Sequence, residues 1–287
     1  MFSKPISDST KRQHASILAV LESKGQIERV DGNIVLHKTL LEFLKLEIGN
    51  PNTRKNYLGA VLRAATTTPP EELKPYVDLY KTTTDWLRGQ RVSQTLPHHR
   101  LENMLKWSEV LQLRGKAETD LSGEDLLTYF LYTLNPPVRA DYANMLVVKS
   151  WSKTRRADTT RNYLVWHDDH AYFVFNVFKT SKTYGQVKVD VSDELYAALQ
   201  GRIVIGSLLL PSTKTPTMLS KRVISVMQKL CGKQMGIGLL RHSYITTFLS
   251  NRVRLIEKMA LAHSMMHSWT QQEEYHIIEN DTDGDAA

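Results

Sequence analysis

The C-terminal part of the chain carries side chains that could together do chemistry on a phosphate group. The stretch from Arg241 to the C-terminus contains His267 and then Tyr275. An arginine guanidinium is a planar fork that matches two phosphate oxygens, and a histidine can donate a hydrogen bond or a proton near neutral pH. A tyrosine hydroxyl becomes a useful nucleophile only when it is positioned and assisted. The set suits attack on a phosphodiester by a protein hydroxyl, without a metal ion.

A second arginine stands at the end of a strongly apolar segment. Residues 126–132 predict a buried helix, which ends at Pro136-Pro137 because proline cannot continue it. Arg139 follows at once, and surface solubility does not explain an arginine in this place. Two interpretations stay open: a structural ion pair with Asp141 or another neighbour, or a second phosphate ligand.

Lysines occupy the connection between two predicted strands. The patterns at residues 171–178 and 186–191 are typical of strands, and Lys179 and Lys182 lie between them. A flexible ammonium group in such a hairpin can reach into a groove and protonate a leaving oxygen. The alternative is a solvent-exposed turn lysine.

Three segments resemble the signature boxes of the tyrosine recombinases, also called the phage-integrase family. Residues 136–142 are similar to box I, Leu240-Arg241-His242-Ser243-Tyr244 to box II, and residues 262–268 to box III. Their order along the chain also follows the family. The sequences of these segments are most similar to those of recombinases from large DNA viruses and eukaryotic mobile elements.

The resemblance implies a mechanism and a set of catalytic residues. Tyr275 would attack a DNA phosphorus and form a 3′-phosphotyrosyl bond, with no cofactor, metal or ATP. Arginines would hold the phosphate, His267 would add a donor, and Lys179, or alternatively Lys182, would protonate the leaving oxygen. The implied catalytic set is Arg139, Asp141, Lys179, Lys182, Arg241, His267 and Tyr275.

Two positions depart from the family pattern. Asp141 follows Arg139 by two positions, whereas the family places its supporting acid three positions after that arginine. Gly238 stands three positions before Arg241, where relatives often carry histidine or lysine. The group expected at position 238 is therefore absent or supplied from elsewhere.

The resemblance also implies the partners: double-stranded DNA, and a homotetramer on two DNA sites. The net charge of +7 favours a polyanionic partner. Two other functions remain open on sequence grounds. One is a type IB topoisomerase or telomere-resolvase-like enzyme, and the other is a catalytically inactive DNA-binding relative.

The predicted fold is mainly α with a small antiparallel β-sheet, in two domains. Residues 1–90 are expected to form a helical DNA-clamp domain, with helices at residues 11–24, 36–48, 54–65 and 69–87. Residues 91–100 are expected to be a linker. Residues 101–287 are expected to form the catalytic domain, with strands at 160–166, 171–178 and 186–191 and an acidic C-terminal tail.

DNA contacts are expected from the third helix and from the linker. The third helix begins with Arg54, Lys55, Asn56 and Tyr57, a combination that suits phosphate contact at a helix N-terminus. The alternative is a solvated helix start with the tyrosine packed inward. In the linker, Arg91 and Arg100 could make a basic strap across DNA or belong to an ordinary exposed connection.

Several classes of protein are disfavoured. Cys231 is the single cysteine, so neither an intrachain disulfide nor a cysteine-based zinc site is possible. The turn at residues 167–170 holds two histidines and two aspartates, for which an ordinary polar turn is favoured over a metal site. No apolar run approaches the roughly 20 residues that span a bilayer, and the N-terminus lacks a secretory signal. We expect an intracellular protein associated with DNA, in the nucleus if the host is eukaryotic.

Overall fold

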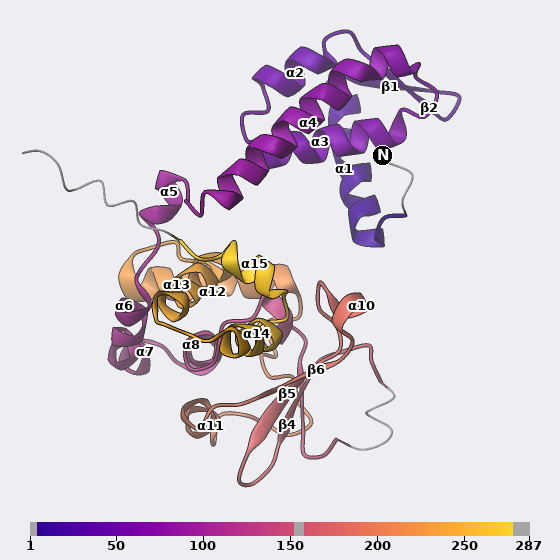
Figure 1. Cartoon of the computed structure of the whole chain (residues 1–287). Helices are drawn as coiled ribbons and strands as arrows, with labels where there is room; N and C mark the ends of the chain where they lie inside the picture. The colour runs from indigo at the N-terminus through magenta and orange to yellow at the C-terminus, as the bar shows by residue number, and fades with distance from the viewer. Residues whose placement is uncertain (1–4, 152–157, 278–287) are drawn as a thin grey trace, which may run out of the picture. The chain divides into compact units, whose positions relative to one another are not determined.

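The computed structural model describes residues 5–151 and 158–277, which divide into two compact units, Met1–Ser93 and Gln94–Ala287 (Figure 1). Helices dominate both units, and strands are few. This confirms the predicted mainly-α, α+β class. The boundary between the units falls inside the expected linker at residues 91–100, and the acidic tail lies outside the described residues.

Four helices and a β-hairpin make up the N-terminal unit. The elements are α1 (Asp8–Ser23), β1 (Ile27–Val30), β2 (Asn33–Leu36), α2 (Leu40–Leu46), α3 (Pro51–Ala64) and α4 (Pro70–Val92). Figure 1 shows α3 and α4 side by side, and the buried apolar faces of α1, α2 and α3 contribute to one core.

The hairpin corrects the predicted second helix. The helix expected at residues 36–48 begins only at Leu40, because residues 33–36 form a strand paired with β1. The two residues between the strands, Asp31 and Gly32, both have positive φ (50° and 79°). That is the geometry of the type I′ turn, which joins antiparallel strands tightly.

The C-terminal unit is a helical body with a four-stranded sheet. Its helices are α5 (His98–Leu101), α6 (Trp107–Gln112), α7 (Arg114–Asp120), α8 (Gly123–Thr133), η1 (Ala140–Tyr142), α10 (Ser181–Tyr184), α11 (Asp193–Leu199), α12 (Pro216–Cys231), α13 (Ile237–Ser250), α14 (Leu255–Ser264) and α15 (Trp269–Glu273). The strands are β3 (Leu146–Val148), β4 (Tyr163–Trp166), β5 (Ala171–Phe175) and β6 (Val187–Asp190). The three expected strands pair antiparallel, but β3 joins β4 in parallel, so the sheet is mixed.

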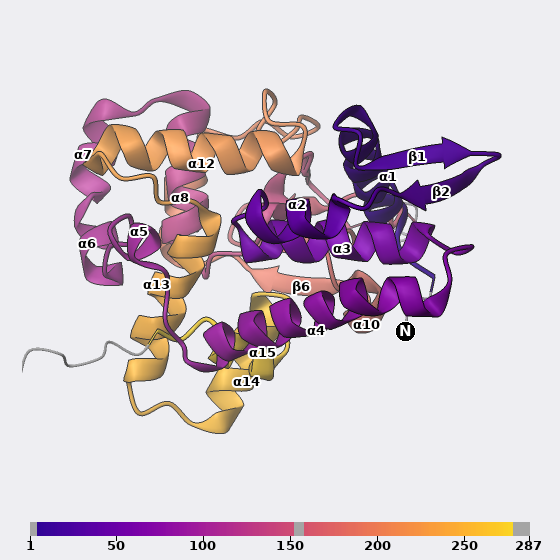
Figure 2. The same cartoon turned by 90° about the horizontal axis from the view of Figure 1, so that it is seen from above.

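Helix α8 is the centre of this unit. All its residues from Leu126 to Thr133 are buried, as expected for a helix that is apolar on every side. Helix α12 packs against α8 with one apolar face, and it runs across the direction of α13 (Figure 2). None of the described helices has both the length and the apolar character needed to cross a membrane.

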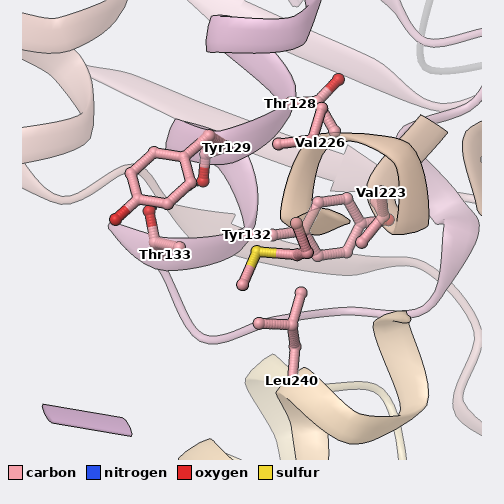
Figure 3. A pocket seen from close by; sticks show the side chains of 8 residues that line it. Thr128, Tyr129, Tyr132, Thr133, Val223, Val226 and Leu240 are labelled. Atoms are coloured by element: carbon pink, nitrogen blue, oxygen red, sulfur yellow. Dashed lines mark hydrogen bonds between the residues drawn. The ribbon is translucent and has the colours of Figure 1, made fainter. Parts of the chain in front are cut away.

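A cavity of about 10 Å³ lies between α8, α12 and the start of α13 (Figure 3). Tyr132, Val223 and Leu240 are among its lining residues. It has room for a single water molecule at most, so it is a packing gap and no substrate site.

One buried amide joins the two segments that carry Arg139 and Lys179. The side chain of Asn162, 5% exposed, donates to the carbonyl oxygens of Asp141 (2.8 Å) and Val177 (3.0 Å). Its Oδ1 accepts hydrogen bonds from the backbone N–H groups of Asn176 and Val177. The amide therefore fixes the η1 turn against the chain that leaves β5.

We predict that Asn162→Ala lowers the free energy of unfolding by about 3 kcal/mol, because it leaves four backbone groups without their partner. Urea unfolding of both proteins measures this difference. The control is Asn251→Ala, which removes an exposed amide with a single hydrogen bond to the Thr247 carbonyl. A loss below about 1 kcal/mol for Asn162→Ala, as expected for an ordinary surface change, would contradict the anchoring role.

Candidate active site

The guanidinium of Arg241, in α13, is the point where three segments meet. The side chain is only 1% exposed. Its Nη1 donates to the carbonyl of Pro137 at 2.7 Å, and its Nη2 lies 2.7 Å from Nδ1 of His267. Its central carbon is 4.9 Å from the ring centroid of Tyr275, a cation–π contact. The three segments that resemble boxes I, II and III are thus joined at one cation.

The contact with Arg241 fixes the protonation of His267. Arginine has donors only, so Nδ1 of His267 must be the acceptor and Nε2 must carry the proton. Burial and the neighbouring charges of Arg241 and Arg139 lower the pKa of His267 to about 3, which keeps the ring neutral. Among the described residues, neither His267 Nε2 nor Arg241 Nε has a hydrogen-bond partner, although both are buried. Two buried N–H donors therefore lack a close acceptor, and they could donate to an oxyanion if the site opened.

Arg139 reaches the same place from the turn after α8. Its Nη1 donates to the carbonyl of Met266 at 3.1 Å, and the hydroxyl of Thr180 donates to the same oxygen at 3.0 Å. Met266 has a positive φ of 56°, an uncommon conformation for a residue with a side chain. The backbone turn at Met266 comes immediately before His267. The strained conformation of Met266 therefore helps to place the imidazole of His267.

Tyr275 lies just beyond α15, with its ring 5.7 Å from that of His267. Its backbone carbonyl accepts a hydrogen bond from Nδ1 of His242 at 2.8 Å. Burial alone raises the pKa of the phenol, but the positive charges of Arg241, Arg139 and Lys179 outweigh it and bring the pKa below the usual 10.0. The phenol therefore loses its proton more easily than an ordinary tyrosine.

Asp141 is the acid beside the two arginines. Burial raises the pKa of Asp141 to about 6, against the opposing effect of Arg139 and Arg241. One carboxylate oxygen has no hydrogen-bond partner among the described residues. Its position two residues after Arg139 still brings it within electrostatic range of both guanidiniums.

The structure separates the two candidate lysines. Both lysines are exposed, but only Lys179 is among the charges that act on Tyr275, whereas Lys182 lies in α10. The expected hairpin tip is in fact interrupted by this short helix. Lys179, which directly follows the buried Phe178, is the lysine associated with the cluster.

The cluster is closed. Arg241 and His267 are 1% and 2% exposed, and Gln272 of α15 is buried beside them with an amide that has no partner among the described residues. The short helix α15 is tied down by Lys258, which forms an ion pair with Glu273 (3.2 Å). A ligand can reach the two free N–H donors only when the covering segment moves.

The four residues of α3 that were expected to contact DNA lie in different surroundings. The guanidinium of Arg54 donates to the carbonyls of Lys45 and Ile48, where α2 ends, and Tyr57 packs against the core of its unit. Lys55 is half-buried, and Asn56 is exposed.

The two linker arginines belong to different units. Arg91 is exposed near the end of α4, so the helix continues into the expected linker. Arg100 is half-buried in α5 of the C-terminal unit.

Sequence reasoning missed two contributors to the cluster. No role in this cluster was predicted for His242, which holds the backbone of Tyr275. No sequence motif distinguishes Gln272 from an exposed glutamine. At the turn of residues 167–170, His170 bonds Asp169, and no group of three or more metal-ligating side chains gathers anywhere in the described part of the chain.

Comparisons of the chain with protein-family models, with curated proteins and with solved structures found no match. The resemblance to tyrosine recombinases therefore stays a prediction from the sequence.

The buried histidines predict an acid-sensitive fold. Burial lowers the pKa of His242 to about 4 and that of His267 to about 3, so both are neutral when folded, whereas in the unfolded chain they become protonated near the ordinary histidine pKa of 6.5. Their contribution to stability is complete above that value and is lost as the pH falls below it. We expect each to remove about 2 kcal/mol between about pH 7.5 and about pH 5.

Denaturant unfolding at the two pH values tests this expectation. His267→Gln, which keeps an acceptor for Arg241 but cannot be protonated, should show a smaller loss than the parent protein. His99→Gln, which changes an exposed ring, is the matched control. An unchanged pH dependence in His267→Gln would contradict a neutral, buried His267.

Proposed function

We propose that this protein is a site-specific DNA recombinase or integrase, which cleaves and rejoins DNA strands through a 3′-phosphotyrosyl intermediate. One observation carries the proposal: Arg139, Arg241 and His267, from three separate segments, surround a tyrosine whose pKa is lowered. Two of these three side chains are buried, and free N–H donors remain in the cluster. A structural role alone would not require unsatisfied donors beside a phenol.

In the proposed reaction, the oxygen of Tyr275 forms a bond to the DNA phosphorus while the bond from phosphorus to the 5′-oxygen breaks. The guanidiniums of Arg139 and Arg241 and Nε2 of His267 donate to the non-bridging oxygens, where charge builds up in the transition state. Lys179 gives a proton to the leaving 5′-oxygen. A 5′-hydroxyl of a second strand then attacks the phosphotyrosyl bond and releases the tyrosine.

The reaction exchanges one phosphoester for another. Each step can therefore be assigned to the side chains named above. The lowered pKa of Tyr275 eases loss of its proton to solvent water before attack, and in the second step the attacking 5′-hydroxyl returns a proton to Lys179. Asp141 faces the arginines and balances part of their charge. Because Arg241 is covered, DNA binding must shift the segment that carries Tyr275. One motion would then both uncover the phosphate ligands and free the phenol.

The proposed partners are double-stranded DNA and three further copies of the chain, in a tetramer on two duplexes. The net charge of +7 supports a polyanionic partner. In this proposal the N-terminal unit clamps the duplex, and the protein works where its DNA is, in the nucleus of a eukaryotic host. Relaxation of supercoiled DNA by a monomer, without joining of two duplexes, would instead favour the topoisomerase or resolvase alternative.

We predict that the protein becomes covalently joined to DNA at Tyr275. The substrate is a pool of duplexes with randomised sequence and a nick that lets the short 5′-fragment diffuse away after cleavage. Denaturing electrophoresis detects the adduct, and mass spectrometry locates the nucleotide on Tyr275. Tyr275→Phe should remove the adduct, whereas Tyr184→Phe, at an exposed tyrosine, should keep it. Tight DNA binding without an adduct would show a binding protein instead.

Arg241→Lys keeps the positive charge but loses the planar fork. We expect it to slow adduct formation by about 100-fold, the usual effect of losing a transition-state donor. Binding of duplex DNA should change by less than about threefold, since a side chain that is 1% exposed adds little to the external field. Arg252→Lys, at an exposed arginine after the same helix, controls for the substitution. Equal losses of cleavage and binding would contradict the assigned role.

A further inference from the structure

Arg100 is a half-buried cation that has no anionic partner in the described part of the chain. Burial lowers its pKa, and the phenol of Tyr275 is the group that opposes this effect. The charge of Arg100 also acts on His242, the residue that holds the Tyr275 backbone. No hydrogen bond or ion pair of the guanidinium is found among the described residues. A charge in such surroundings is costly unless an anion joins it.

The chain on both sides of Arg100 is fixed against the same unit. Before it, the side chain of Gln94 donates to the carbonyl of Glu273 at 2.8 Å, close to Tyr275. After it, Oδ1 of Asn103 accepts from the backbone of Gln234 at 2.7 Å, shortly before α13 begins. Residues 94–103 therefore form a strap that is bound at both ends, and Arg100 lies between the two attachments.

The guanidinium of Arg100 lies in contact range of Gly238, where α13 carries no side chain. A Cβ atom built on Gly238 would lie 3.5 Å from Nη2 of Arg100. Gly238 and Arg241 are three residues apart on α13, so their side-chain directions share one face of the helix. A long side chain at position 238 would compete with Arg100 for the place one turn before Arg241.

We infer that Arg100 is a third guanidinium of the phosphate site, which supplies from the strap the cation that Gly238 cannot supply from α13. The inference rests on the proposed function, since the ligand is the phosphate that Tyr275 attacks. Arg100 would donate to a phosphate oxygen on the side of the site that faces the start of α13. It would be a catalytic residue, and its contribution would be largest in the transition state.

The test exchanges the cation between the two positions. Arg100→Ala should slow formation of the Tyr275 adduct by about 100-fold. Gly238→Lys alone should also slow it, because the lysine and Arg100 occupy the same space. The double variant Arg100→Ala, Gly238→Lys should be at least about tenfold faster than Arg100→Ala. Arg252→Ala, at the exposed arginine that follows α13, is the control and should leave the rate unchanged.

A rate for Arg100→Ala within about twofold of the parent, or a double variant no faster than Arg100→Ala, would overturn the inference. Urea unfolding of each variant shows whether a loss reflects folding. A second readout needs no catalysis: titration with inorganic phosphate, followed by ¹⁵N NMR of the His267 ring. Arg100→Ala should weaken this binding at least about tenfold, and the double variant should recover it. If the wild type forms no adduct, the proposed function fails, while the phosphate titration still decides whether Arg100 belongs to an anion site.

Discussion

The contact between the buried guanidinium of Arg241 and the rings of His267 and Tyr275 is the constraint on which the C-terminal unit depends. Three segments distant in sequence converge there, through the Pro137 carbonyl, Nδ1 of His267 and the face of the phenol. A buried guanidinium is tolerated only when its donors are engaged, so the segments must adopt this arrangement together. Because arginine cannot accept, the same contact also sets which nitrogen of His267 carries the proton.

The resulting cluster has an excess of positive charge. Arg139, Arg241 and Lys179 act on the same phenol, and Asp141 is a weakened acid beside them, because burial raises its pKa to about 6. Repulsion among the cations destabilises the closed form, and unsatisfied N–H groups add to the cost. A bound phosphate would reduce the repulsion among the cations and would accept hydrogen bonds from the unsatisfied N–H groups. In our account, the energy that opens the site comes from the ligand itself.

Sequence patterns predicted the helical class and three of the four strands of the mixed sheet, because apolar periodicity is a local signal. The resemblance to tyrosine recombinases singled out Arg139, Arg241, His267 and Tyr275, which the structure brings together. Sequence patterns failed where tertiary contacts decide. The Asp31-Gly32 turn places Leu36, expected at the start of a helix, at the end of a strand, and β3 pairs in parallel with β4, the next strand along the chain. The role of His242 depends on a carbonyl 33 residues away, and the place of Arg100 depends on packing against Gly238, so no local pattern could show either.

The most direct test of the account is a crystal structure of the protein with a nicked DNA duplex and vanadate, which mimics the transition state of phosphoryl transfer. The account predicts that vanadium bonds to the Tyr275 oxygen, with Arg139, Arg241 and Nε2 of His267 on its equatorial oxygens and α15 displaced from its position here. A complex in which DNA and vanadate bind elsewhere, while Arg241 stays sealed beneath Tyr275, would contradict it.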